Sequence, residues 1–243
     1  MKLARFWARA SQDGAVARGW SDESLEQARE AARRTARLVA EKLASGSEKK
    51  LYLYGDRPLP EPVLQEFPGA VVTRNVYGAL VLNTRDLMFI DIDREGDQAG
   101  ASILRMVEQS GLAAHVYRTA AGHRVLLTNS SFEAGSPSSE GWLQHFGADA
   151  LYTRLCRLQQ SFRARLTPKP WRCGLGMPPV SFPFDTPDAE ARFNQWLRRY
   201  NAAAQGYATC RLVGETGTAH PAFADLIGYH DQETKAVSSM PLA

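Results

Sequence analysis

The sequence predicts an α+β fold with one mostly antiparallel sheet and helices on one face of it. Apolar segments at 87–92, 113–118 and 124–128 are short and separated by turn residues, which is typical of antiparallel strands. A helical pattern at 99–110 lies between the first two of them. This strand-helix-strand-strand order within one domain indicates an α+β fold. The chain of 243 residues is 44% hydrophobic, enough to bury a globular core.

The N-terminal part of the chain, residues 1–50, is predicted to be a loosely held leader over 1–20 followed by a helical extension. Ser21 is the predicted N-cap of a helix over 21–43, and acidic residues follow it in the first turn. The apolar residues of this helix recur at helical spacing: Leu25, Ala28, Ala32, Ala36, Val39 and Leu43. Residues 51–243 are predicted to form a single α+β domain.

Further elements of this domain follow from the same patterns. Strands are predicted at 51–54, 70–73, 77–82 and 207–213, and the proline-rich stretch 55–68 is predicted to be a loop. Helical spacing of apolar residues predicts helices over 151–162, from Pro187 to about 200, and in the tail over 221–236. Pro187 suits the first turn of its helix, with Thr186 before it as the cap.

The charge is unevenly distributed along the chain. The net charge is +3, yet residues 150–184 contain no acidic residue and six basic ones, so the rest of the chain carries −3. Arg163 and Arg165 alternate as they would on one face of a strand, and Lys169 and Arg172 follow among prolines and a tryptophan. Arginines on a rigid element suit phosphate recognition. The alternative interpretation is a solvated helix face followed by a basic loop.

Several classes of protein are disfavoured by the sequence. Every apolar stretch is broken by a charged residue before reaching the length of a membrane helix, and no secretory segment is evident. Cys156, Cys173 and Cys210 have no zinc-type spacing and are expected to be reduced packing residues of a cytoplasmic protein. The motifs of P-loop nucleotidases, dinucleotide enzymes and α/β-hydrolases are absent from the sequence.

An Asp-x-Asp motif, Asp91 and Asp93, ends the apolar segment 87–92. Side chains two positions apart share one face of a strand, so the two carboxylates are expected to lie together, where their mutual repulsion favours a shared divalent cation. Mg²⁺ and Mn²⁺ take such oxygen ligands. Glu95 and Asp97 could extend the acidic cluster. The alternative is a solvated strand end, or pairing of the aspartates with basic residues: Arg94, Arg118 or Arg124.

A turn of small residues lies between the two strands predicted at 113–118 and 124–128. Its sequence, Thr119-Ala120-Ala121-Gly122, lets backbone N–H groups approach a ligand closely, as in phosphate-binding nests. His123 and Arg124 open the strand after the turn. The alternative interpretation is a simple hairpin with an exposed tip.

Together, residues 85–130 resemble the catalytic core of archaeo-eukaryotic primases, the primase-polymerases with an RRM-like palm of βαββ order. The resemblance implies that Asp91 and Asp93 are catalytic metal ligands for Mg²⁺ or Mn²⁺, and that His123 contacts the phosphates of a nucleotide. Strict alignment puts Arg124 in the histidine position. A third acidic ligand is expected on a later strand, and Asp185 is the available candidate. The segment 162–174 also resembles uncharacterised bacterial proteins.

The resemblance implies metal-dependent nucleotidyl or phosphoryl transfer acting on nucleotides or on single-stranded DNA or RNA. The residues expected to contact phosphate or nucleic acid are His123, Arg124, Arg118, Arg163, Arg165, Lys169 and Arg172. Two alternatives stay open: a catalytically inactive palm that binds nucleic acid, and a protein-interaction module whose basic segment docks an acidic partner.

Overall fold

The computed structural model describes residues 1–45, 58–94 and 96–243, so the strand predicted at 51–54 lies outside the described residues. The chain divides into two compact units. The larger unit contains residues 63–177 and 199–243 together with Met1, and the smaller unit contains residues 2–62 and 178–198. The division falls inside helix α5 (Pro187–Ala204).

The smaller unit begins with a β-hairpin, which replaces the loosely held leader predicted for residues 1–20. Strands β1 (Phe6–Gln12) and β2 (Ala15–Ser21) pair antiparallel, and helix α1 (Leu25–Ala44) packs against both. The approach is close, because a Cβ added to Gly19 would lie 2.2 Å from the backbone nitrogen of Ala32. The buried stripe of α1 accordingly consists of small side chains: Ala28, Ala32, Ala36 and Ala40.

Two helix starts illustrate how N-caps select a boundary. Helix α1 starts after Ser24, whose side chain accepts a hydrogen bond from the backbone N–H of Gln27, rather than after the predicted Ser21. Ser21 is the last residue of β2, so its backbone belongs to the hairpin. Thr186 is confirmed as the cap of α5, since its hydroxyl accepts from the backbone N–H of Ala189 at 3.1 Å.

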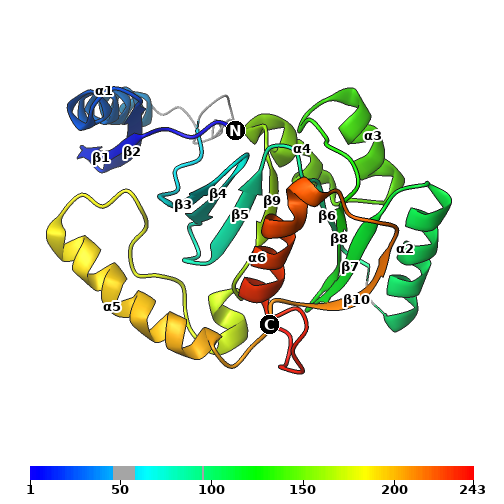
Figure 1. Ribbon diagram of the computed structural model, residues 1–243. Coiled ribbons are helices and arrows are strands. Elements are labelled where there is room, and N and C mark those ends of the chain that lie inside the picture. Colours follow the sequence, from blue (N-terminus) through cyan, green and yellow to red (C-terminus); the bar gives the residue numbers. More distant parts are fainter. Residues whose placement is uncertain (46–57, 95) are drawn as a thin grey trace. The chain divides into compact units, whose positions relative to one another are not determined.

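The described part of the larger unit contains two antiparallel sheets of four strands each, whereas the sequence predicted one sheet (Figure 1). The first sheet has the spatial order β3 (Val63–Phe67), β4 (Ala70–Arg74), β5 (Leu80–Thr84), β9 (Phe162–Arg165). The second has the order β10 (Cys210–Thr216), β7 (Ala114–Thr119), β8 (Gly122–Leu127), β6 (Phe89–Ile92). Strand β3 forms in the stretch predicted to be a loop.

The helices of the larger unit include α2 (Asp97–Gln109), α3 (Pro137–His145), α4 (Ala150–Gln159), α6 (Ala224–Thr234) and the short 3₁₀ helices η1 (Pro170–Cys173) and η2 (Pro221–Phe223). Helix α2 packs on β7 and β10. Helix α6 covers the opposite face, where the ring of His230 contacts Tyr117 and Phe89. The second sheet therefore carries helices on both faces, whereas the sequence predicted helices on one face, and β8 is accordingly buried along its whole length. Among the described residues, no helix has the length and apolar character needed to cross a membrane.

The predicted strand-helix-strand-strand order is confirmed and acquires a definite topology. Strand β6 leads through α2 to β7, and β8 lies between β6 and β7, antiparallel to each. The crossover therefore skips one strand position, which β8 then fills. This arrangement brings the end of β6 beside the start of β8.

Strand β6 lies at an edge of its sheet, although its apolar residues predicted a central position. Its outer backbone is nevertheless satisfied by helix α4. The hydroxyl of Tyr152 donates to the carbonyl of Phe89 at 2.7 Å, and the backbone N–H of Asp149 donates to the carbonyl of Asp91 at 3.2 Å. Strand β9 also contacts β6. These neighbours bury β6 as a further strand would.

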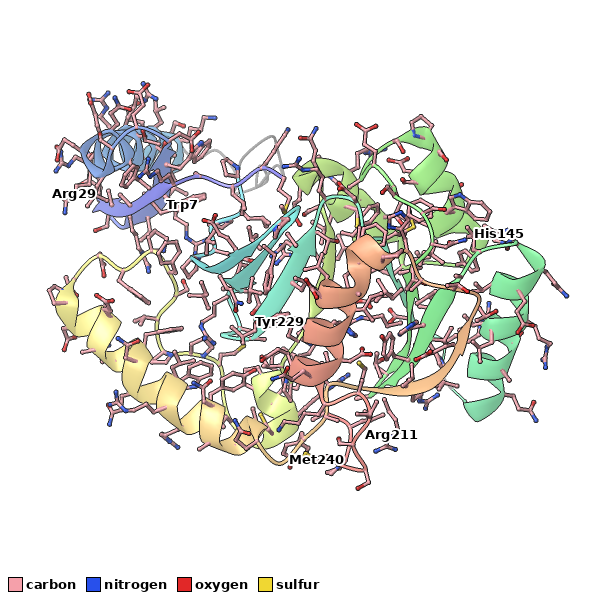
Figure 2. All side chains as sticks on the ribbon, in the orientation of Figure 1. Trp7, Arg29, His145, Arg211, Tyr229 and Met240 are labelled. Atoms are coloured by element: carbon pink, nitrogen blue, oxygen red, sulfur yellow. The ribbon has the colours of Figure 1, made fainter. Side chains whose placement is uncertain are left out.

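The C-terminal tail returns to the start of β10. Arg211 donates to the carbonyl of Met240 at 2.6 Å, and both residues are labelled at this end of the unit in Figure 2. Ala208 and Leu242 form a parallel bridge. The three cysteines are buried, and no disulfide joins them.

Candidate functional site

The pairing of β6 with β8 places Asp91 directly opposite Arg124 on the sheet face that α6 covers. The Arg124 Nε–H donates to Asp91 Oδ1 over 2.9 Å. The Arg124 side chain is only 1% exposed, whereas that of Asp91 is 37% exposed at the end of the strand. Burial disfavours the charge of Arg124 and is the largest single influence, but the Asp91 carboxylate together with Cys210 and Tyr152 outweighs it, so the pKa of this guanidinium is raised. The ion pair is one alternative left open by the sequence.

Hydrogen bonds connect Arg124 to side chains of helix α6. We call the five residues that they link the buried network: Asp91, Arg124, His230, Asp231 and Tyr117. Arg124 Nη1 lies 3.4 Å from His230 Nε2. His230 Nδ1 lies 2.9 Å from Asp231 Oδ1, which also accepts from the Tyr117 hydroxyl at 2.6 Å. A neutral His230 satisfies both neighbours if Nδ1 carries the proton and Nε2 accepts from Arg124.

Burial also determines the protonation of this network. It lowers the pKa of His230 from the usual value of 6.5, against the hydrogen bond to Asp231, so the ring is neutral at pH 7. Burial raises the pKa of Tyr117, and the Asp231 charge adds to that effect. Arg124 is thus the cation of the network, with the Asp91 carboxylate on one side of it and the neutral His230 ring on the other.

A second group of charges gathers beside Asp91 and Asp93, and we call it the cation cluster: Arg165, Lys169 and Arg172. Burial, and then the charge of Arg124, lowers the pKa of Arg165 to about 10. Burial also lowers the pKa of Lys169, followed by the charges of Arg165 and Arg172, whereas Asp93 and Asp91 act in the opposite direction. Four charged groups, Arg165, Arg172, Asp93 and Asp91, therefore lie within electrostatic reach of Lys169.

The cation cluster differs from the buried network in its hydrogen bonds. Arg165 Nε is buried and has no hydrogen-bond partner among the described atoms, although the Arg165 carbonyl accepts from Arg124 Nη1 at 3.0 Å. No carboxylate in the described ranges forms an ion pair with Arg165, Lys169 or Arg172. Asp93 is exposed just beyond the last residue of β6. Within the described residues, the cluster thus holds like charges together without a direct counterion.

The segment that carries the cluster is held firmly. The Tyr200 hydroxyl lies 2.6 Å from the carbonyl of Pro168 and 2.8 Å from Thr167 Oγ1, and the backbone N–H of Leu80 donates to that same Oγ1 at 2.9 Å. Lys169 precedes η1, which starts with Pro170. The three side chains of the cation cluster are consequently carried by a rigid backbone rather than by a flexible tail.

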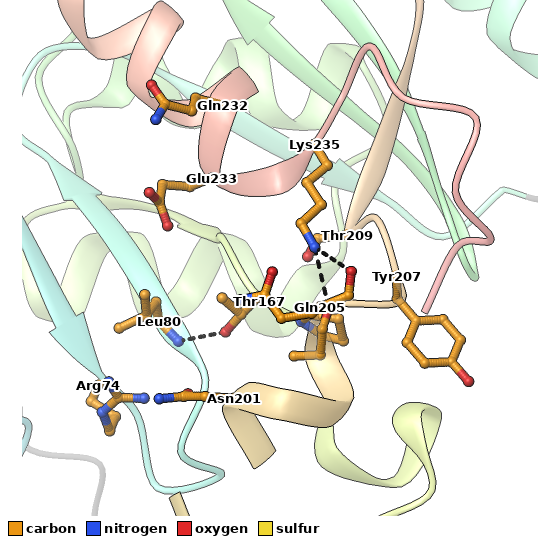
Figure 3. Close-up of a pocket in the computed structure, with 12 residues that line it drawn as sticks. Arg74, Leu80, Thr167, Asn201, Gln205, Tyr207, Thr209, Gln232, Glu233 and Lys235 are labelled. Atoms are coloured by element: carbon orange, nitrogen blue, oxygen red, sulfur yellow. Dashed lines mark hydrogen bonds between the residues drawn. The ribbon is translucent and has the colours of Figure 1, made fainter. Parts of the chain in front are cut away.

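The same segment lines a cavity of about 350 Å³, drawn in Figure 3. Thr167 and Pro168 face it together with the end of α5 and residues of α6. Its two cations bind backbone carbonyls: Arg74 donates to Gly78 at 2.6 Å, and Lys235 donates to Gln205 at 2.7 Å. These bonds stabilise a turn and a helix end, so the cavity cations act in the fold.

Two predicted phosphate contacts lie away from this face. His123 neighbours Arg124 and so points to the α2 side of the sheet, where its Nδ1 lies 2.9 Å from the carbonyl of Arg94. A Cβ added to Gly100 of α2 would lie 3.2 Å from His123 Nε2. Arg118 is paired with His123 across the sheet and shares its face. The structure therefore places Arg124, and not His123 or Arg118, beside Asp91.

The remaining predicted residues have separate positions. The Arg163 guanidinium donates to the Gln159 side chain at 3.1 Å, which directs it towards α4. Asp185 belongs to the smaller unit, whereas Asp91 and Asp93 belong to the larger one. Glu95 lies outside the described residues, and Asp97 is the first residue of α2.

The oxygen atoms at the end of β6 meet only part of what Mg²⁺ or Mn²⁺ requires. Asp91 and Asp93 offer the hard oxygens that these ions prefer. Asp91 Oδ1, however, already accepts from the buried Arg124 guanidinium, whose fixed positive charge opposes a second cation beside it. Across the described ranges, no group of three or more His, Cys, Asp or Glu side chains is arranged to hold a metal. As arranged, a metal ion at this strand end would compete with the Arg124 guanidinium for Asp91 Oδ1.

The sequence did not predict that helix α6 contributes side chains to the site. The adjacent His230 and Asp231 on a predicted helix were the only signal, and their partners Arg124 and Tyr117 are more than 100 positions earlier in the chain. Such long-range contacts leave no local pattern in the sequence. Comparison with protein-family models, with curated proteins and with solved structures found no match to this chain.

Proposed function

We propose that this chain binds single-stranded nucleic acid, with the cation cluster contacting the phosphates. The observation that carries the proposal is the gathering of Arg165, Lys169 and Arg172 without an ion-paired carboxylate in the described part of the chain. Mutual repulsion between like charges raises the free energy of the folded chain, and a bound anion removes that cost. Guanidinium and ammonium groups on a rigid backbone are well suited to phosphate.

The topology supports placing this function on a primase-like palm. Strands β6, β8 and β7 with α2 as crossover have the βαββ order that the resemblance to primases implies. The two aspartates that would be catalytic in that family lie next to the cluster. Arg124 occupies the position opposite Asp91 and neutralises it. We therefore propose that this palm retains phosphate binding and has replaced the metal site by a guanidinium.

Binding to a fluorescently labelled thymidine oligonucleotide, followed by anisotropy at low salt, tests the proposal. We expect binding that persists in EDTA and weakens as salt is added, because phosphate contacts release counterions. The variant Lys169→Gln/Arg172→Gln is expected to bind at least about tenfold more weakly. The matched control is Arg29→Gln/Arg33→Gln, which removes the same charge from the exposed face of α1.

Two results would contradict the proposal. The first is no binding by the wild-type chain at low salt. The second is an equal loss in the cluster variant and in the α1 control, because a uniform response to net charge does not require a site.

Metal-dependent nucleotidyl transfer is the second candidate, and the position of Asp91 and Asp93 at one strand end beside the cluster favours it. Its test is incubation with Mn²⁺, labelled nucleotides and a single-stranded template. Product formed by the wild type and lost in Asp91→Ala/Asp93→Ala would establish it. Equal product from both proteins, or none from either, would reject it.

A further inference from the structure

A large aromatic side chain stands beside the cation cluster. Trp171 lies in η1, between Lys169 and Arg172 of the cation cluster, and is 49% exposed. Lys169 Nζ lies 5.5 Å from the centroid of its ring. The ring of Tyr77 meets Trp171 edge-on, with centroids 5.3 Å apart and planes at 83°. The tryptophan therefore keeps its orientation while half of its surface remains in water.

The supports of this ring are rigid on both sides. The side chain of Asn75 accepts from the backbone N–H groups of Tyr77 and Ala79, at 3.0 and 3.1 Å, which fixes the turn that carries Tyr77. Arg74 holds the same turn through the carbonyl of Gly78. On the other side, Pro170 begins η1 and its carbonyl accepts from the backbone N–H of Leu175. The indole is thus held in one orientation while about half of it stays exposed, which leaves aromatic surface open to a ligand.

The chemistry that best suits an exposed indole next to phosphate-binding cations is a stacked nucleobase. Every base has an aromatic face, and proteins that hold single strands combine a basic groove with aromatic side chains. The bases of a duplex are already stacked on each other, so they cannot use such a ring. A polyanion without bases can use the cations but not the tryptophan.

We propose that Trp171 stacks on an unpaired base of a strand whose phosphates are held by Arg165, Lys169 and Arg172. This inference rests on the proposed function and deepens it, since it names the unpaired base as the feature that distinguishes the ligand from other polyanions. It assigns selectivity to Trp171 and charge recognition to the cluster.

The test compares two probes, a thymidine oligonucleotide and inorganic polyphosphate of similar charge, each titrated into the full chain. Trp171→Leu is expected to weaken oligonucleotide binding about tenfold, the scale of one lost stacking contact, and to leave polyphosphate binding unchanged. Trp171→Phe keeps an aromatic face and is expected to restore most of the affinity. The matched control is Trp20→Leu, a partly exposed tryptophan of the smaller unit.

The outcomes separate this inference from the function on which it rests. An equal loss for both probes in Trp171→Leu would overturn stacking, because it would mean that Trp171 only supports the cluster, while phosphate binding would stand. Unchanged oligonucleotide affinity in Trp171→Leu would overturn it as well. Failure of the wild type to bind either probe would instead remove the proposed function and this inference with it.

Discussion

The buried network and the cation cluster lie next to each other yet treat charge in opposite ways. In the network, each charged group meets an opposite charge or a hydrogen-bond partner, from Asp91 through Arg124 to Asp231. In the cluster, burial and then the charges of neighbouring cations lower the pKa values of Arg165 and Lys169, and Arg165 Nε is buried without a hydrogen bond to the described residues. From this difference we infer that Arg124 stabilises the fold, whereas the charges of the cation cluster are not required for folding.

Arg124→Met breaks the network at its centre and has the largest expected effect. The change leaves the Asp91 carboxylate without its partner and removes the link to His230, so we expect the free energy of unfolding to fall by about 3 kcal/mol. Urea denaturation measures it. Arg105→Met on the exposed side of α2 serves as the control and is expected to change stability by less than about 0.5 kcal/mol. A loss below about 1 kcal/mol would show that the pair is not structural.

Gly122→Ala sharpens the role of the turn that joins β7 to β8. An added Cβ would lie 2.2 Å from the carbonyl oxygen of Ile92 and 3.2 Å from Asp93 Cα, so the backbone at the carboxylate pair must move. We expect a loss of about 2 kcal/mol in the free energy of unfolding. Gly141→Ala is the matched control, since nothing lies within 4 Å of its added Cβ and alanine favours helix α3 by about 1 kcal/mol. Equal stability of the two variants would refute the close approach.

Arg165→Met examines the cluster from the side of stability. Methionine keeps most of the buried volume and removes a buried cation whose Nε has no hydrogen-bond partner in the described ranges, so we expect the free energy of unfolding to rise by about 1 kcal/mol. Oligonucleotide affinity should fall in the same variant. Arg163→Met provides the comparison, because the Arg163 guanidinium donates to Gln159 and its removal should not stabilise the protein. Destabilisation by Arg165→Met would show that the charge contributes to folding.

His230 yields the smallest effect, and it appears as a pH dependence. Burial holds the pKa of His230 below its usual 6.5, so the unfolded chain binds the proton more readily and folding loses stability as the pH falls through about 6.5. The stability lost through this group between pH 7 and pH 6 is at most about 0.7 kcal/mol. It is measured as the difference in slope between the wild type and His230→Gln. Identical slopes would mean that His230 is not held neutral.

Local patterns carried much of the fold, because caps, turns and strand periodicity depend on neighbours in the sequence. The segment from β6 to β8 and the cap at Thr186 follow from such patterns. The hairpin of residues 6–21 was not predicted, because its two strands contain no long apolar run. They are joined by a tight turn at Asp13 and Gly14. The choice between one sheet and two depends on pairing between β5 and β9, about 80 positions apart, which leaves no local signal.

The site was predicted in part for the same reason. Alternation along a strand predicted that Asp91 and Asp93 lie together, and the acid-free segment identified Arg165, Lys169 and Arg172, which lie near both aspartates. Which of His123 and Arg124 meets Asp91 depends on the register of β6 against β8, and that register requires the structure. The cover provided by α6 is a tertiary contact that no spacing in the sequence encodes.

The salt dependence of oligonucleotide binding tests the central claim most directly, because its slope counts the phosphate contacts. Three contacts from Arg165, Lys169 and Arg172 predict a slope of about −2 in a plot of log K against log salt concentration for a single strand. Lys169→Gln/Arg172→Gln should reduce the slope to about −0.7, with EDTA changing neither value. The same slope in both proteins would contradict the account, since the cluster would then make no contact with phosphate.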